Sequence, residues 1–277
     1  MIATKCQSLI NLSQKSGVVH TGGFRKVYMP TQPNTQVVKV ELIKQTKSYA
    51  GFVPDIEEII EVIQVSSNVF QPIIKGNKLS YDAPKVKEEM IDGEHCFVYL
   101  EELIPEFRST FPLIDLCSTF LYKIENLVEW YQFILDLDYL EQKEFILETL
   151  VELEFKNAST VLNLINNTIH LTPVVTELIT GIRKYFELTN CFPDLTGHHN
   201  IFINIDNPKN PHLVVTSSAT KAFFDFNRLI FINSQFSTNH KRGITLNFLE
   251  SAIWTNLLCI FVDEPPVYEL DHILAAL

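Results

Sequence analysis

A glycine cluster near the amino terminus has the composition of a phosphate-binding turn. Gly17, Gly22 and Gly23 are three of only nine glycines in a chain of 277 residues. Glycine permits positive φ angles and a close approach of the backbone, so a glycine-rich turn between two strands can direct N–H groups at phosphate oxygens. The same residues also fit an ordinary β-hairpin turn, and the cluster by itself leaves both interpretations open.

A lysine follows the glycine cluster within an apolar run. Lys39 is flanked by Val37, Val38 and Val40, and the run predicts a strand over residues 37–43. A lysine that points from such a strand needs a partner on its face of the sheet, because burial of an unpaired charge is costly. Lys39 therefore fits either a solubilising lysine on an edge strand or a functional lysine beneath the glycine turn.

A third group of polar residues occupies the segment 191–203, between a predicted helix and a predicted strand. It contains Asp194 and Asn200. A carboxylate and an amide in a loop suit general-base chemistry and magnesium ligation, and they suit turn capping equally well. The neighbouring His198 and His199 predict no zinc site, because adjacent side chains diverge and no carboxylate stands at a ligand spacing from them.

A last acidic residue, Asp225, lies among aromatic side chains in the run Phe223-Phe224-Asp225-Phe226-Asn227. A carboxylate in such apolar surroundings is costly to bury without a cation or a hydrogen-bond donor. We therefore expect a metal ion or a lysine beside Asp225.

Composition limits the classes of partner. The net charge is −11, from 22 Lys and Arg against 33 Asp and Glu, which argues against nucleic acid and anionic membranes as main partners. The five cysteines are odd in number and never spaced as CxxC, a pattern typical of reduced intracellular thiols. No segment approaches the ~18 apolar residues of a membrane helix, so no membrane insertion is expected. We expect a cytoplasmic protein, with export by a signal-less route left open.

The elements predicted along the chain change in type at about residue 103. The first part predicts strands and one helix, which begins at Asp55. That helix has an apolar face of Ile56, Ile59, Ile60 and Ile63 and an acidic face of Glu57, Glu58 and Glu61. The predicted strands of this part cover residues 18–19, 26–29, 37–43, 78–81 and 95–100, with a turn at Asp92-Gly93 between the last two.

The second part predicts mainly helices. They cover residues 116–133, 139–153, 158–165, 172–188 and 246–261, with short strands at 201–205, 213–216 and 222–225. A β-rich part followed by a helical part predicts an α+β fold of two lobes. We place the amino-terminal lobe at 1–103 and the carboxy-terminal lobe at 104–277.

The serial order of these features resembles the protein-kinase-like superfamily, in a divergent form covering roughly residues 15–260. Gly22 matches the second glycine of the kinase glycine loop and Phe24 its aromatic tip, while His20 and Arg25 replace the first and third glycines. The resemblance implies that Gly22, Gly23 and Phe24 cover the nucleotide.

Lys39 is similar to the kinase lysine of the third strand, and the match implies that it contacts the nucleotide phosphates. The helix that begins at Asp55 resembles the helix that supplies a glutamate partner to that lysine. Glu57, Glu58 and Glu61 are the candidates for this partner, and the sequence does not choose among them.

In the same resemblance, Asp194 corresponds to the catalytic base or to the carboxylate that orients the acceptor hydroxyl, and Asn200 corresponds to a magnesium ligand. Asn200 lies six residues after Asp194 where the family spacing is five, so either one residue bulges or His199 takes the ligand position. Asp225-Phe226-Asn227 resembles Asp-Phe-Gly, which implies that Asp225 binds Mg²⁺. With its short chain after Asp225, the sequence is more similar to small bacterial or effector kinase-like proteins and aminoglycoside-type phosphotransferases than to eukaryotic protein kinases.

Three functions follow as hypotheses. The first is an ATP- and Mg²⁺-dependent phosphotransferase that moves the γ-phosphoryl group to a hydroxyl of a protein or small molecule. The second is an inactive pseudokinase that serves as a binding or regulatory module. The third is a structural α+β protein with accidental motif order. The acidic balance mildly favours a cationic acceptor. The run Glu101-Glu102, with Glu106, fits a surface that faces such an acceptor, and we expect the simpler alternative of a solvated charge run.

Overall fold

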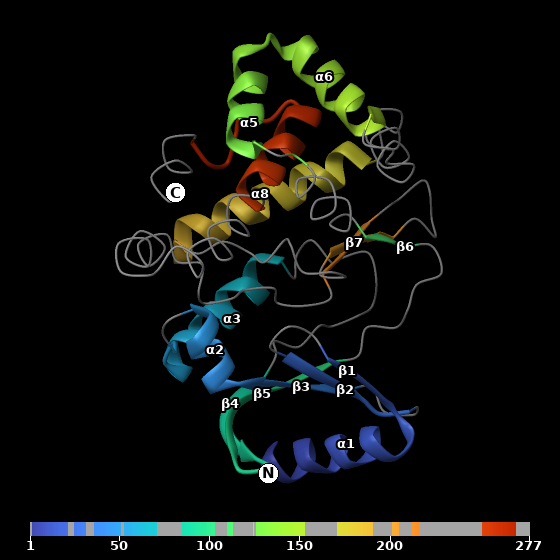
Figure 1. Cartoon of the computed structure of the whole chain (residues 1–277), viewed down its shortest axis with the longest axis vertical. Helices are drawn as coiled ribbons and strands as arrows, with labels where there is room; N and C mark the ends of the chain where they lie inside the picture. The colour runs from blue at the N-terminus through green and yellow to red at the C-terminus, as the bar shows by residue number, and fades with distance from the viewer. Residues whose placement is uncertain are drawn as a thin grey trace.

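The computed structural model of the chain describes most of its predicted elements (Figure 1). The described residues are 2–21, 25–31, 36–50, 53–70, 85–102, 110–112, 124, 126–152, 171–190, 201–204, 212–215 and 251–269. They form an α+β structure with a five-stranded antiparallel sheet in the amino-terminal part and several helices in the carboxy-terminal part. The strands predicted at 78–81 and 222–225 and the helix predicted at 158–165 lie outside the described residues.

The five-stranded sheet has the order β1-β2-β3-β5-β4, and every neighbouring pair is antiparallel. Its strands are β1 (Val18–Thr21), β2 (Arg25–Met29), β3 (Gln36–Leu42), β4 (Lys85–Ile91) and β5 (Glu94–Glu102). The strands predicted at 18–19, 26–29, 37–43 and 95–100 are confirmed. β3 lies at the centre of the sheet, between β2 and β5, so Lys39 is not on an edge strand.

β4 was not predicted, and its composition explains why. The strand reads Lys-Val-Lys-Glu-Glu-Met-Ile and lies at the edge of the sheet, where charged side chains reduce unwanted pairing. The turn predicted at Asp92-Gly93 is confirmed. It joins β4 to β5 with two residues at positive φ, 52° at Asp92 and 80° at Gly93, as a tight two-residue hairpin turn requires.

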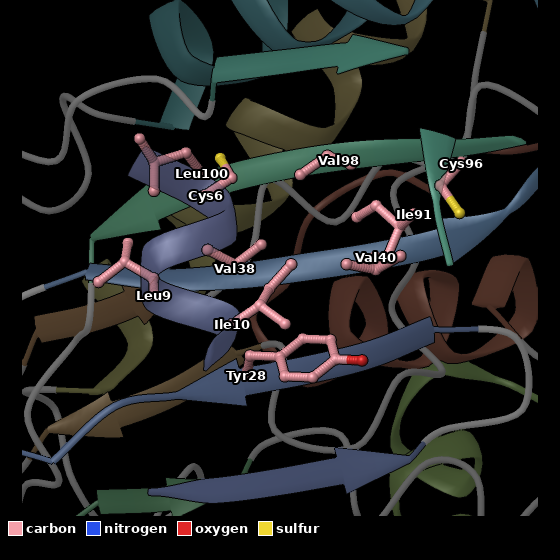
Figure 2. Close-up of a cluster of buried hydrophobic side chains, with 10 residues drawn as sticks. All are labelled: Cys6, Leu9, Ile10, Tyr28, Val38, Val40, Ile91, Cys96, Val98 and Leu100. Carbon is pink, nitrogen blue, oxygen red and sulfur yellow. The ribbon is translucent and has the colours of Figure 1, made fainter. Parts of the chain in front are cut away.

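Helix α1 (Ile2–Ser16) covers one face of this sheet. Cys6, Leu9, Ile10 and Ser13 are spaced i, i+3, i+4 and i+7, and all four are buried against the strands. Figure 2 shows the apolar cluster that results, in which three of these helix residues meet inward side chains of β2, β3, β4 and β5. The prediction of a single helix before residue 100 is therefore wrong, because the apolar stripe of α1 is short and mixed with polar residues.

Gly17 forms the junction between α1 and β1. Its N–H donates to the Ser13 carbonyl at 3.0 Å, which closes the last turn of the helix. A Cβ atom at this position would lie 2.3 Å from the carbonyl oxygen of Met29 and 2.8 Å from Cα of Ser13. The lack of a side chain at Gly17 thus allows the helix to meet the sheet, and Gly17 is separated from the β1–β2 turn by the whole of β1.

Two helices follow β3. They are α2 (Ile43–Ala50), which was not predicted, and α3 (Ile56–Phe70), whose start near Asp55 is confirmed. The first-turn amide of Ile59 donates to the Asp55 carbonyl at 3.1 Å. α1 and α3 lie on opposite sides of the sheet in Figure 1. α3 also packs against α8 (Leu171–Thr189), where the rings of Phe70 and Tyr185 are 5.9 Å apart.

The carboxy-terminal part contains α5 (Leu127–Asp136), α6 (Tyr139–Glu152), α8 and a helical segment at 251–261. α6 and α8 confirm the helices predicted at 139–153 and 172–188. The prediction of a helix at 116–133 is wrong in its start, because residues 124 and 126 are not helical. Asn126 is the N-cap, with φ −120° and ψ 68°, and α5 begins at Leu127.

The apolar segment near the carboxy terminus is a core helix. Every residue from 251 to 259 is buried, including Trp254 and the polar Thr255 and Asn256. A helix that is buried all round is typically apolar on every face. In the part of the chain that the structure describes, no helix has the length and apolarity needed to cross a membrane.

A second, three-stranded antiparallel sheet joins distant parts of the sequence. Its order is β6-β7-β8, with β6 (Thr110–Pro112), β7 (Ile201–Asn204) and β8 (His212–Val215). β7 and β8 confirm the strands predicted at 201–205 and 213–216. β6 was not predicted, and three residues give too short a period to recognise.

Candidate functional site

A row of polar side chains crosses the face of the five-stranded sheet that points away from α1. Side chains alternate between the faces of a strand, so residues beside the α1-facing Val38, Val40, Val98 and Leu100 point to the opposite face. We call the following five residues the polar row: Arg25 from β2, Lys39 and Glu41 from β3, and Tyr99 and Glu101 from β5. This face lies on the side of the sheet where α3 is found (Figure 1).

Lys39 forms an ion pair within the row. Its Nζ lies 2.6 Å from Oε2 of Glu101, and the two side chains are 14% and 4% exposed. Lys39 is directly opposite Tyr99 and Val37 is opposite Glu101, so the pair is diagonal across the β3–β5 ladder. The partner that a lysine in an apolar strand requires is thus an acidic residue of the neighbouring strand.

Arg25 forms the second ion pair of the row, with Glu41 directly opposite it in the β2–β3 ladder. The guanidinium Nε donates to Oε2 of Glu41 at 2.6 Å, and the Glu41 side chain is fully buried. Arg25 also lies over the ring of Tyr99, 5.0 Å from its centroid, in a cation–π contact.

The electrostatics of this pair favour the charged arginine. Burial acts to lower the pKa of Arg25, but Glu41, supported by Tyr99 and Glu101, outweighs burial and raises that pKa above its ordinary value. Burial and the charge of Glu41 raise the pKa of the Tyr99 hydroxyl, although Arg25 opposes this effect. Arg25 therefore stays cationic and Tyr99 stays protonated over the physiological range.

The row brings two cations together on one face. Val27, not Arg25, is opposite Lys39, so Arg25 and Lys39 are diagonal neighbours across the β2–β3 ladder. A lysine ammonium and an arginine guanidinium are the usual protein ligands of phosphate oxygens. In this structure two carboxylates balance the two cations, so the row carries no net charge.

The structure places the residues predicted for the glycine loop as follows. β1 and β2 form an antiparallel hairpin, with Thr21 opposite Lys26, and Arg25 opens β2. Gly22, Gly23 and Phe24 connect the two strands and lie outside the described residues. Arg25, which the resemblance to kinases matches to the third glycine of that loop, contributes its side chain to the polar row.

The predicted acidic partners of Lys39 lie on α3. Glu57 and Glu61 are exposed and Glu58 is half-buried. The ion-pair partner that the structure shows for Lys39 is Glu101. The prediction of a solvated run at Glu101 is wrong, because this residue is buried at 5% exposure. Strand alternation was the available signal for its role, since it puts Glu101 on the same face as Tyr99.

Besides Lys39, the residues predicted for catalysis and metal binding are Asp194, His199, Asn200 and Asp225, and these four lie outside the described residues. Asn200 directly precedes β7, which starts at Ile201. Within the described ranges, no group of three or more His, Cys, Asp or Glu residues could hold a metal ion. The magnesium ligands proposed from the sequence therefore remain predictions.

Comparisons with known proteins add no relative. No family model, no curated protein and no solved structure matches the chain.

Proposed function

We propose that the chain is an ATP- and Mg²⁺-dependent phosphotransferase of the protein-kinase-like type. The observation that carries the proposal is the position of Lys39. It is a mostly buried lysine on the central strand, beside the strand that follows the glycine-containing β1–β2 connection. A cation held in this way can bind phosphate oxygens in partly dry surroundings, where its charge acts more strongly than in water.

The rest of the proposed site comes from the sequence. Lys39 binds the phosphates, Gly22, Gly23 and Phe24 cover them, and Asp194 orients the acceptor hydroxyl. Asn200, or His199 in its place, and Asp225 hold Mg²⁺, which neutralises charge on the transferred phosphoryl group. These assignments require that Asp194 and Asp225 lie near Lys39 in the folded chain.

A matched pair of lysine variants tests the proposal. Lys39→Met removes the mostly buried cation, and Lys26→Met removes an exposed lysine of the neighbouring strand β2. We expect Mg-ATP to raise the melting temperature of the wild type and of Lys26→Met, and to leave Lys39→Met unchanged. Equal shifts in both variants contradict the proposed role of Lys39. Loss of Mg²⁺-dependent binding and transfer in Asp225→Ala tests the metal assignment separately.

A second function, the inactive pseudokinase, is favoured by one observation. Both cations of the polar row already have carboxylate partners, so the row is neutral without a nucleotide. A vestigial site of this kind holds its fold together through internal ion pairs. The absence of any thermal shift at millimolar Mg-ATP, together with no phosphoryl transfer, supports this function over the first.

A further inference from the structure

The charge of Lys39 is already balanced by Glu101 in the structure, before any phosphate binds. A triphosphate brings several negative charges to a face on which the two cations are already paired with two carboxylates. Opposite charges stabilise each other and like charges repel strongly at low exposure to water. A phosphate can therefore bind Lys39 well only if Glu101 releases it.

The two ion pairs of the polar row differ in how easily they can be opened. Arg25 is held by two side chains, Glu41 directly across the ladder and the ring of Tyr99. Among the described contacts of Lys39, the ion pair with Glu101 alone holds its ammonium group. A lysine ammonium on a flexible stem can change its partner more readily than an arginine held by stacking and an ion pair.

Glu101 also lies next to the end of β5. β4 pairs with β5 only as far as Leu100, so Glu101 and Glu102 have a neighbouring strand on the β3 side alone within the described residues. Glu102 ends β5, next to the point at which the sequence predicts the boundary between the two lobes. Glu101 thus has a described neighbouring strand on one side, whereas Glu41 is covered on both sides by β2 and β5.

We propose that Glu101 is an internal competitor for Lys39, which a nucleotide phosphate must displace before it can bind. This inference rests on the proposed function. Glu101 is then a positioning residue that sets how tightly phosphates bind, and the Lys39–Glu101 pair is the phosphate-free state of the site. The Arg25–Glu41 pair stays closed in both states and keeps β2 and β3 in register.

The test measures binding by isothermal titration calorimetry with Mg-ATP, inorganic tripolyphosphate and adenosine as probes. Glu101→Gln keeps the shape of the side chain and removes its charge. We expect Glu101→Gln to bind Mg-ATP and tripolyphosphate at least about tenfold more tightly than the wild type. This factor corresponds to the lower end of the free energy of one charge-assisted hydrogen bond, which the phosphate no longer has to break. Adenosine carries no phosphate, so its affinity is expected to stay unchanged.

Two further variants complete the experiment. Glu94→Gln removes an exposed carboxylate of the same strand, paired with Lys44 at the surface, and is expected to bind as the wild type does. Glu101→Asp keeps the charge but retracts it by one methylene group, and it is expected to bind more tightly than the wild type and less tightly than Glu101→Gln. Circular dichroism establishes which variants fold, so Glu101→Asp preserves the test if Glu101→Gln is unstable.

The outcomes separate the two proposals. If Lys39→Met loses phosphate binding while Glu101→Gln and Glu101→Asp bind as the wild type does, the competitor role is wrong and the phosphate site stands. If no variant binds either phosphate probe, or if Lys39→Met binds normally, the phosphate site is wrong and the competitor role falls with it. If Glu101→Gln binds the phosphate probes tightly and the wild type shows no measurable binding, the phosphate site and the competitor role are both supported.

Discussion

Asn256 donates a hydrogen bond of 2.8 Å from its side-chain amide to the hydroxyl of Tyr131, which lies 125 residues earlier in the chain. The same amide nitrogen donates to the Tyr268 carbonyl at 2.7 Å, and the Asn256 carbonyl oxygen accepts from the amides of Val267 and Tyr268 at 3.0 and 3.1 Å. All donors and acceptors of this buried amide are thus satisfied. One residue of the core helix joins α5 to the segment that follows the helix.

Asn256→Ala is expected to destabilise the protein by about 3–5 kcal/mol. The substitution leaves three backbone groups and one hydroxyl without their partner, and an unsatisfied buried polar group costs about 1–3 kcal/mol, partly relieved by water. The free energy of unfolding from urea denaturation measures the effect. Asn68→Ala, at an exposed position of α3, is the control and is expected to change stability by less than about 0.5 kcal/mol. A similar loss in both variants contradicts the role of the network.

The junction at Gly17 makes a second prediction. Gly17→Ala places Cβ against the carbonyl oxygen of Met29 and Cα of Ser13, which are backbone atoms and can yield only if α1 moves. Overpacking of this kind costs about 1–3 kcal/mol. We expect a loss in that range in urea unfolding, with a weaker near-ultraviolet signal from the α1–sheet contact.

Gly93→Asn is the matched control for Gly17→Ala. Gly93 has φ of 80°, and a Cβ atom added to it would meet nothing within 4 Å, so its requirement is conformational and not steric. Asparagine tolerates the left-handed region better than other residues with side chains, and the loss is expected to stay below about 1 kcal/mol. If Gly17→Ala costs less than about 1 kcal/mol, as is expected of Gly93→Asn, the close approach at Met29 is not what demands glycine at position 17.

Local patterns predicted the elements whose own residues carry the signal. The β-branched run around Lys39, the isoleucine spacing after Asp55 and the Asp92-Gly93 turn all appear in the structure as expected. β4 was not predicted, because an edge strand rich in lysine and glutamate has no apolar alternation. Its assignment depends on the register with β5, which is a relation between two segments and not a property of either.

The site shows the same division. The need of Lys39 for a partner followed from its apolar flanks, because the cost of an unpaired buried charge is local. The identity of that partner did not follow, since Glu101 lies 62 positions further on and reaches Lys39 only through the order of the strands. The sequence instead suggested the glutamates of helix α3 as partners of Lys39, and two of these, Glu57 and Glu61, are exposed.

Alkaline pH is expected to weaken the carboxy-terminal helices through Cys259. Burial raises the pKa of its thiol from 9.0 to about 11. Because the folded state holds this proton more tightly than the unfolded state, the contribution is complete below pH 9 and is lost as the pH rises to 11. Two pH units correspond to a loss of roughly 2–3 kcal/mol.

Urea unfolding of the wild type and of Cys259→Ala between pH 8 and 11 measures this contribution. We expect the stability of the wild type to fall more steeply above pH 9 than that of Cys259→Ala. Burial also raises the pKa of Tyr131 to about 12, so both proteins lose stability above pH 10 through the tyrosine. Parallel curves from pH 9 to 10 contradict the assignment to Cys259.

The Arg25–Glu41 pair is expected to be structural, in contrast to the pair of Lys39. Glu41→Gln removes the charge that balances Arg25 in a buried setting, and breaking a buried pair on one side costs about 3–5 kcal/mol. We expect a loss near the lower end of that range, because glutamine still accepts a hydrogen bond and the Tyr99 ring still covers the guanidinium. Glu94→Gln opens an exposed pair with Lys44 and is expected to cost below about 1 kcal/mol.

The Arg25→Met, Glu41→Gln double variant removes both charges, and it is expected to recover part of the stability that Glu41→Gln loses. If the losses of the two single variants simply add in urea unfolding, Arg25 and Glu41 are not coupled and β2 does not depend on their contact.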